Sequence, residues 1–111
     1  MQHIVGGVIV VNTETIAGKV ITKNLGVVGG STVRAKNVGR DIFAGLKNIV
    51  GGELTAYTEL LDESRNQAIS RMIADATARG ANAVINVRFA TSAVTAGASE
   101  LFAYGTAVVV E

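Results

Sequence analysis

The chain has 111 residues, of which 49% are hydrophobic and 17% are charged, and its ten Lys and Arg side chains nearly balance nine Asp and Glu. This length is typical of one domain spanning residues 1–111, and the even charge balance excludes the basic excess that nucleic-acid binding requires. No cysteine is present, which excludes disulfides and thiolate metal sites. Because charged residues fall well below the average of about 25% for soluble domains, we expect the chain to bury apolar surface against other copies of itself.

The amino-terminal segment predicts one β-strand from His3 to Val11, in which β-branched residues dominate and Gly6 and Gly7 interrupt. The polar residues 12–14 are typical of a turn or loop that would end this strand. The apolar run has no Lys or Arg before it and is far shorter than the roughly 20 residues of a membrane-spanning helix. We therefore expect a cytoplasmic protein that does not associate with membranes.

The next segment, residues 19–35, is rich in Val and Thr and predicts either two short strands or one bent strand with a glycine bulge or turn. Its glycines are Gly26, Gly29 and Gly30. A phosphate-binding loop has similar glycines, but it needs a Lys directly before the residue that corresponds to Ser31, and a helix after it. Here glycine precedes Ser31 and residues 32–35 have strand character. We therefore interpret the glycines as structural.

A short helix is predicted after Asn37, a residue type that often caps the amino terminus of a helix. Apolar residues follow at helical spacing: Val38, Ile42, Leu46 and Ile49. Gly51 and Gly52 predict its end, because glycine readily adopts the left-handed conformation that closes a last turn. Asp41 lies in the first turn, where unpaired amides favour a carboxylate, and Arg40 falls away from the apolar stripe.

A long amphipathic helix is predicted to begin near Thr55 and to stop at Gly80. Its broad apolar face consists of Tyr57, Leu60, Leu61, Ala68, Met72, Ile73 and Ala76. Acidic residues gather near its amino end and basic residues near its carboxyl end, as the helix dipole favours. Asp75 and Arg79 are spaced as a correctly oriented ion pair. The apolar face predicts that this helix packs on a sheet.

Two further strands are predicted after the long helix. The first alternates between an apolar set and a more polar set: Ala83, Ile85, Val87 and Phe89 against Val84, Asn86 and Arg88. Asn86 and Arg88 would therefore share a face. The small polar residues at 91–99 predict a flexible loop or a hairpin connection. The last strand, from Leu101 to Val110, is apolar on both faces, and we interpret the cover of its second face as a neighbouring subunit.

These elements predict an α+β fold in which one long and one short helix pack on a mostly antiparallel sheet. The sequence also carries NVGRDIFAGLKNIVGG at 37–52, GANAVI at 80–85 and YGTAVVV at 104–110. With these motifs it resembles the YbjQ family, small bacterial proteins of unknown function that are often described as candidates for heavy-metal binding. The resemblance covers nearly everything from about Thr13 to Glu111. It implies a protomer that assembles into a ring-shaped pentamer through extra strands.

The resemblance also implies a set of ligand-binding residues, Arg40, Asp41, Tyr57, Glu63 and Arg65. These side chains would cluster where the two predicted helices meet. The chain departs from some relatives at two positions connected with metal binding. Leu25 stands where those relatives carry Cys, and Ala90 stands where they carry an acidic residue.

We predict an oligomeric binding or scaffold protein that holds a small ligand, a metal ion or a partner protein at subunit interfaces or in a ring pore. The alternative is a heavy-metal-binding protein that uses carboxylate or His ligands, the single histidine being His3. The candidate oxygen donors are Asp41, Glu59, Asp62, Glu63, Asn82 and Asn86. We do not expect catalysis, because the sequence offers no Ser/His/Asp or Cys/His set.

Overall fold

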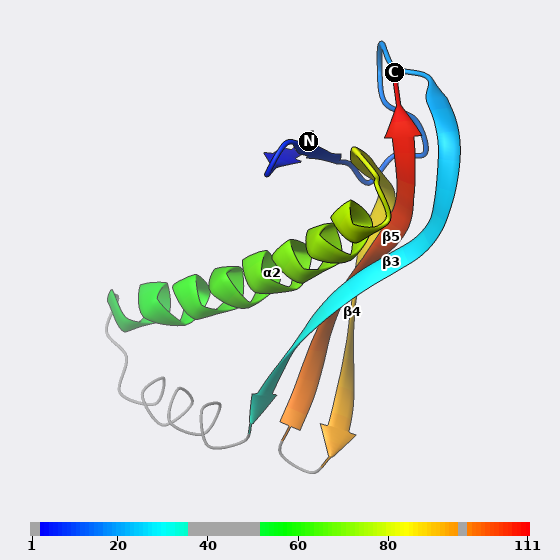
Figure 1. Cartoon of the computed structure of the whole chain (residues 1–111). Coiled ribbons are helices and arrows are strands. Elements are labelled where there is room, and N and C mark those ends of the chain that lie inside the picture. The colour runs from blue at the N-terminus through cyan, green and yellow to red at the C-terminus, as the bar shows by residue number, and fades with distance from the viewer. Residues whose placement is uncertain (1–2, 36–51, 96–97) are drawn as a thin grey trace.

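The computed structural model describes residues 3–35, 52–95 and 98–111, and these form an α+β fold with one long helix against a five-stranded sheet (Figure 1). The elements are β1 (His3–Val5), β2 (Val8–Val10), β3 (Ile21–Ala35), α2 (Gly52–Ala78), β4 (Ala83–Thr95) and β5 (Ala98–Val110). The strand order is β1-β2-β4-β5-β3, and every neighbouring pair is antiparallel except β2 and β4. The mostly antiparallel sheet is confirmed. The short helix predicted after Asn37 lies outside the described residues.

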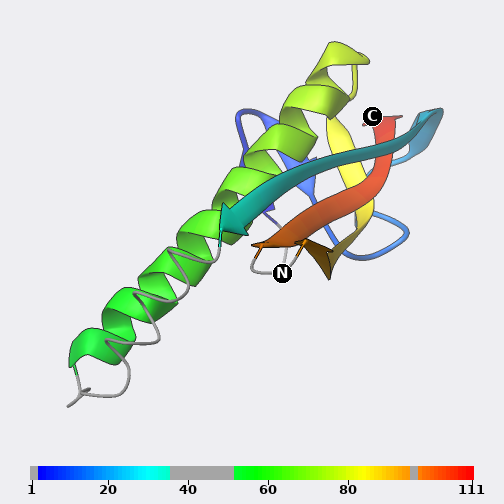
Figure 2. The ribbon, with the colours of Figure 1, turned by 90° about the horizontal axis from the view of Figure 1, so that it is seen from below.

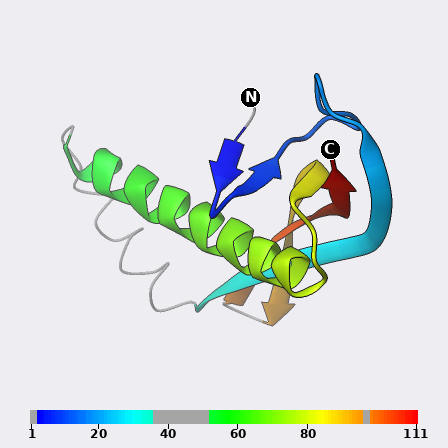
Figure 3. The ribbon, with the colours of Figure 1, turned by 45° about the horizontal axis from the view of Figure 1, so that its top comes forward.

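The amino-terminal segment forms a hairpin of two short strands, so the prediction of one strand from His3 to Val11 is wrong. β1 and β2 pair in antiparallel register, with Val5 opposite Val8. Gly6 and Gly7 form the turn with φ angles of 57° and 80°. Two consecutive positive φ angles are what a tight hairpin turn requires, and glycine adopts them without steric penalty. Figure 3 shows this hairpin in dark blue.

β3 is one long bent strand, which confirms the second of the two alternatives for residues 19–35. It runs antiparallel to β5 over almost its whole length, from Ile21 opposite Val110 to Ala35 opposite Ala98. The register shifts between Asn24 and Gly26, where Gly26 has a φ of 94°. The Asn24 side chain accepts a hydrogen bond from the Gly26 amide at 3.0 Å, which stabilises the bulge locally.

α2 packs its carboxyl-terminal half on the sheet and ends as the sequence predicts, although it begins before Thr55. The helix-side core contains Val8, Val10, Val28, Ala68, Met72, Ile73, Ala76, Ala81, Val84, Val87, Ala103 and Ala107. At the helix end, the Gly80 amide donates to Thr77 O at 3.0 Å and the Ala81 amide to Ala76 O at 3.1 Å. These two bonds, with Gly80 at a φ of 83°, are the Schellman motif that terminates helices.

The glycines of β3 allow the helix to approach closely, which supports their structural interpretation. A Cβ atom on Gly30 would lie 2.6 Å from the Ala68 carbonyl oxygen of α2. Two residues away, buried Thr32 donates from Oγ1 to the Ser64 carbonyl oxygen at 3.3 Å. The amino-terminal half of α2 extends past the sheet (Figure 2), and Leu61 on this half is 38% exposed. The chain is correspondingly elongated, with a radius of gyration of 16.6 Å, against about 13 Å for a compact domain of this length.

β4 contains a bulge that breaks the predicted alternation. Asn86 has a φ of 54°, and the pairing with β5 shifts between Ile85 and Arg88. As a result Val87 lies in the helix-side core with Val84, and not in the core that contains Ile85. The predicted alternation is therefore wrong beyond Ile85, because one extra residue in a strand moves every later side chain to the other face.

The second face of β5 is covered at its carboxyl end by the chain itself. A second core contains Val11, Ile16, Ala83, Ile85, Val108 and Val110. Ile16 is 5% exposed and comes from the segment after β2. The interpretation that a neighbouring subunit covers this face is therefore wrong for the Val108–Val110 end of the strand.

The region 91–99 is mostly strand. β4 continues to Thr95 and β5 begins at Ala98, so the hairpin connection itself is shorter than predicted. The residues there are small and polar, but pairing between the two strands satisfies the backbone groups that face each other and extends both strands.

Candidate functional site

The ligand-binding residues expected from the sequence lie on or before the amino-terminal half of α2. Arg40 and Asp41 fall outside the described residues, and of Tyr57 only the helical backbone is described. Glu63 and Arg65 are exposed. Residues two apart on a helix do not face each other, and Arg65 instead pairs with Asp62.

The ion pair between Arg65 and Asp62 is a surface pair. It joins Nη1 and Oδ1 at 2.7 Å, and the two side chains are 48% and 59% exposed. A pair this exposed contributes little to stability, typically below about 1 kcal/mol. Both charges remain accessible from solvent.

The candidate oxygen donors for a metal fall into separate groups. Asp41 lies outside the described residues, the carboxylates Glu59, Asp62 and Glu63 lie on the amino-terminal half of α2, and Asn82 and Asn86 lie beyond its carboxyl end. Glu63 precedes Asn82 by most of the helix, a separation on the order of 25 Å along the axis. The Asn82 side chain is engaged locally, since Nδ2 donates to Val110 O at 2.9 Å and Oδ1 accepts from the Val110 amide at 2.8 Å. Among the residues that the structure describes, no group of three or more His, Cys, Asp or Glu side chains could hold a metal ion.

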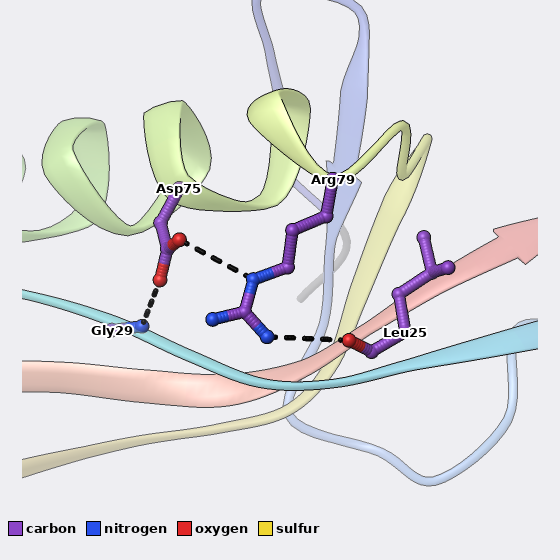
Figure 4. A network of polar contacts seen from close by, with 4 residues as sticks. All are labelled: Leu25, Gly29, Asp75 and Arg79. Atoms are coloured by element: carbon purple, nitrogen blue, oxygen red, sulfur yellow. Dashed lines mark hydrogen bonds and ion pairs between the residues drawn. The ribbon is translucent and has the colours of Figure 1, made fainter.

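A row of charged side chains on α2 covers the free edge of β3, the edge that does not pair with β5 (Figure 4). Asp75 Oδ2 accepts a hydrogen bond from the Gly29 amide at 3.3 Å, and Asp75 Oδ1 pairs with Arg79 Nε at 3.4 Å. Arg79 Nη1 donates to the Leu25 carbonyl oxygen at 3.3 Å. One turn earlier, Arg71 Nη1 donates to the backbone of β3 at residue 31.

We refer to Arg71, Asp75 and Arg79 as the edge seal, because they bind backbone groups of the edge strand that no neighbouring strand in the described sheet pairs. Their spacing of four residues places them on one stripe of the helix. The sequence predicts the Asp75–Arg79 pair correctly but does not reveal its contact with β3, because those residues lie far away along the chain.

At the other side of the sheet, β4 has an open edge. From Arg88 to Ala93 it pairs residue by residue with β5, between two register shifts. β2 pairs with β4 only near Ala83 and Val84. Within the described residues no strand pairs with the other side of Phe89–Ala93, and all five of these side chains are exposed.

The face of the sheet opposite α2, here called the outer face, carries exposed apolar side chains away from the second core. Phe102 and Tyr104 stack with ring centroids 5.5 Å apart. On β3, Val27 and Val33 are 68% and 55% exposed. They share this face, because they alternate with Val28 and Thr32, which are buried toward α2. The outer face can bind apolar surface.

Arg88, which the sequence predicts to lie on a polar face, forms hydrogen bonds to backbone carbonyl groups. Its Nη1 donates to the Asn12 carbonyl oxygen at 3.0 Å and to the Val87 carbonyl oxygen at 3.1 Å. The guanidinium thereby ties the segment after β2 to β4. The Asn86 amide adds a bond to the Thr13 carbonyl oxygen at 3.0 Å in the same region.

Comparison with known sequences decides the family. The sequence profile described as "Putative heavy-metal-binding" for the YbjQ family matches residues 8–111. The chain belongs to the YbjQ family. A UPF0145 protein of Hahella chejuensis is 66% identical over 103 residues, which cover 93% of this chain and 99% of that protein. UPF0145 proteins of Dehalococcoides mccartyi and Methanosarcina acetivorans are 62% and 59% identical over 93% and 90% of this chain, and over 99% and 94% of their own lengths.

A solved structure shares the fold of this YbjQ-family chain. It is a protein of unknown function from Pediococcus pentosaceus, with a TM-score of 0.61 and 15% sequence identity over 95% of this chain and 99% of that one. At that identity the similarity shows the fold alone. In the described residues, no helix is both long enough and apolar enough to cross a membrane.

Proposed function

We propose that this protein is a homo-oligomeric binding or scaffold protein of the cytoplasm, assembled as a ring-shaped pentamer, which holds a small ligand or a metal ion at subunit interfaces or in the ring pore. The observation that carries this proposal is the outer face. Val27 is 68% exposed and Val33 is 55% exposed beside the stacked pair of Phe102 and Tyr104. Burying one such valine against another copy contributes roughly 1.5 kcal/mol, so a soluble chain gains by covering this face.

The elongated shape supports assembly independently. The principal extents are 52 × 30 × 19 Å, and the amino-terminal half of α2 projects beyond the sheet (Figure 2). A long helix that extends past its own core has a surface that a neighbouring copy can cover. On that projecting half, the Leu61 side chain is 38% exposed.

The ligand site that we propose comprises Arg40, Asp41, Tyr57, Glu63 and Arg65, placed between copies. Glu63 and Arg65 are exposed on the projecting half of α2. Charged side chains in that position can bind a ligand only when another surface encloses them, because an open site leaves them solvated. This role is binding and not catalysis, since the sequence lacks a nucleophile and base set.

Native mass spectrometry of protein purified without chelators tests the proposal. We expect five copies per particle and retained mass from a small molecule or metal ion. A monomer at micromolar concentration overturns the assembly, and a pentamer that retains no added mass overturns the binding role.

A second candidate function is heavy-metal binding through carboxylate or His ligands, which the description of the family favours. The described part of one protomer offers no cluster of such ligands, so the proposed site uses one carboxylate from each copy around the ring axis, where symmetry multiplies a single side chain. Calorimetric titration with zinc, copper, nickel, calcium and magnesium tests it. We expect a stoichiometry of one ion per ring for one of them, and no saturable heat with any of them would exclude this function.

A further inference from the structure

We infer that the edge of β2 is a binding site for an extended, uncharged apolar peptide segment of a partner protein, and that β1 occupies this site as an internal competitor. The site is separate from the proposed ligand site on α2, and it does not depend on the assembly of copies.

β1 and its turn lie outside the part of the chain that the family shares. The family profile begins at residue 8, which is the first residue of β2. The match to the Hahella chejuensis protein covers 99% of that protein, which leaves too few residues outside the match for a further strand. On this side, the sheet of the shared domain therefore ends at β2, and β1 is an addition to it in this chain (Figure 3).

The edge of β2 carries backbone groups that only an added strand satisfies. The amides of Ile9 and Val11 donate to the carbonyl oxygens of residues 82 and 84 at 3.1 and 3.0 Å, so they face β4. Because backbone groups alternate in direction along a strand, those of Val8 and Val10 face β1. The side chains of Val8 and Val10 are only 4% and 5% exposed in the helix-side core, and this packing holds the edge in an extended conformation.

β1 is held weakly enough to be displaced. It has three residues, and in the described sheet it pairs with β2 alone. Ile4 is 66% exposed, and Val5 is only partly buried against the helix-side core. A Cβ atom on Gly6 or Gly7 would meet nothing within 4 Å, so the turn is not packed against the rest of the chain.

The short connection to β2 is therefore what mainly keeps β1 in place. A short tether gives a segment an effective local concentration in about the millimolar range. A partner peptide with a dissociation constant well below that range displaces β1 from the edge, because both pair with the same backbone groups of β2.

The sequence of β1 indicates which peptide the edge accepts. Residues 3–11 contain no Lys, Arg, Asp or Glu, so the edge provides no charge that would pair with a charged peptide. β1 contains Ile4 and Val5, whose β-branched side chains favour an extended conformation. The partner is therefore an extended segment of β-branched, uncharged residues, which binds by strand addition through main-chain hydrogen bonds.

The test uses a truncated protein that lacks residues 2–7, so that Val8 follows Met1. The probes are a peptide with the sequence of residues 2–7, QHIVGG, and an unrelated uncharged peptide, TVIVT. The control is the first peptide with proline in place of the residues that correspond to His3 and Val5, because it lacks the two N–H groups that face β2. NMR follows chemical shifts and hydrogen exchange at Val10, which faces the vacated edge, and at Ile9, which faces β4.

We expect both probe peptides to bind the truncated protein with half-saturation at about millimolar concentration, and the wild type to need at least about tenfold more. Exchange of the Val10 amide should be fast in the truncated protein and slow about tenfold at a peptide concentration ten times the dissociation constant. Exchange at Ile9 should stay slow throughout. The proline peptide should have no effect.

The inference is overturned if Val10 does not respond, if the wild type responds equally, or if only the peptide with the β1 sequence binds. Native mass spectrometry compares the copy number of the two proteins. A larger particle for the truncated protein assigns the edge to a second copy and overturns the partner peptide. If the truncated protein does not fold, as judged by circular dichroism, the variant H3P/V5P replaces it. Loss of folding in both shows that β1 is an essential part of the domain and overturns the inference, while the proposed function stands.

Discussion

The two long edges of this sheet differ in how their backbone groups are satisfied. Along β3, one helical stripe of α2 supplies a carboxylate and two guanidinium groups to the edge backbone. Along β4, residues Phe89–Ala93 carry neither charge nor cover in the described part of the chain. A protomer with one sealed and one open edge cannot continue a sheet in both directions. Strand addition at the open edge therefore ends after one partner and does not continue into a fibre.

The sealed edge depends on a close approach between α2 and β3, and Gly30→Val should break it with the largest effect. A Cβ at Gly30 would lie 2.6 Å from Ala68 O and 2.6 Å from Arg71 Cβ, so the helix must move away. We expect the free energy of unfolding to fall by about 3 kcal/mol, the upper end of typical overpacking penalties. Urea denaturation followed by circular dichroism measures this loss.

Gly29→Ala is the control for that substitution. Its Cβ would approach the Phe102 ring at 2.5 Å and the Ala103 carbonyl oxygen at 3.2 Å. The ring can turn away on the outer face, and the contact with the backbone oxygen is less close than those at Gly30. The loss should therefore be clearly smaller. Equal losses for the two variants would contradict the view that helix approach, and not crowding along β3 in general, is what Gly30 protects.

The next largest effect is expected from Asp75→Ala, which opens the seal at its centre. The substitution leaves the Gly29 amide without its acceptor and removes the partner of Arg79 Nε. We expect a loss of about 1 kcal/mol in the free energy of unfolding, together with new self-association through β3 that light scattering detects. Asp75→Asn keeps an acceptor oxygen and should show less self-association. If the edge seal does not prevent self-association, both variants will keep the wild-type particle size.

The sequence predicts the parts of this asymmetry that are determined locally. The end of α2 follows from Gly80, because a left-handed glycine after an apolar periodic stretch closes a helix whatever lies around it. The Asp75–Arg79 pair follows from spacing alone. The contact of this pair with Gly29 does not, because the partners are 46 residues apart and only the fold brings them together.

The errors in the sequence interpretation have a common cause. The face on which a strand residue lies, and the strand with which it pairs, depend on contacts that the sequence alone does not show. A single residue in the left-handed region, Asn86, moves Val87 to the other face, and periodicity cannot show this before the partner strand is known. Gly6 and Gly7 were expected within one strand, and their positive φ angles instead make a turn. Of the expected ligand residues, Glu63 and Arg65 lie exposed on α2, and their role remains a prediction.

The bulge at Asn86 lies where β4 separates from β2 and its edge becomes open. Substitutions at Asn86 should therefore alter the backbone conformation at the start of that edge. Asn86→Val places a β-branched residue at a φ of 54°, which costs about 1–2 kcal/mol because its Cβ approaches the next carbonyl oxygen. A fall of several degrees in melting temperature is expected in thermal unfolding. Asn86→Gly should unfold near the wild-type temperature. A tolerated valine would show that the bulge is not held in this conformation.

Arg65→Ala should have the smallest effect on stability, and it tests the proposed ligand site directly. Its pair with Asp62 is about half exposed on both sides, and such pairs contribute about 0.5 kcal/mol or less. Urea denaturation should therefore barely distinguish R65A from wild type, and the double variant D62A/R65A should add nothing measurable. Native mass spectrometry then separates the two roles of the residue. Loss of retained ligand mass with unchanged stability and copy number places Arg65 in the binding site. Unchanged ligand mass shows that Arg65 is not part of that site and is only a solvated surface charge on the projecting half of α2.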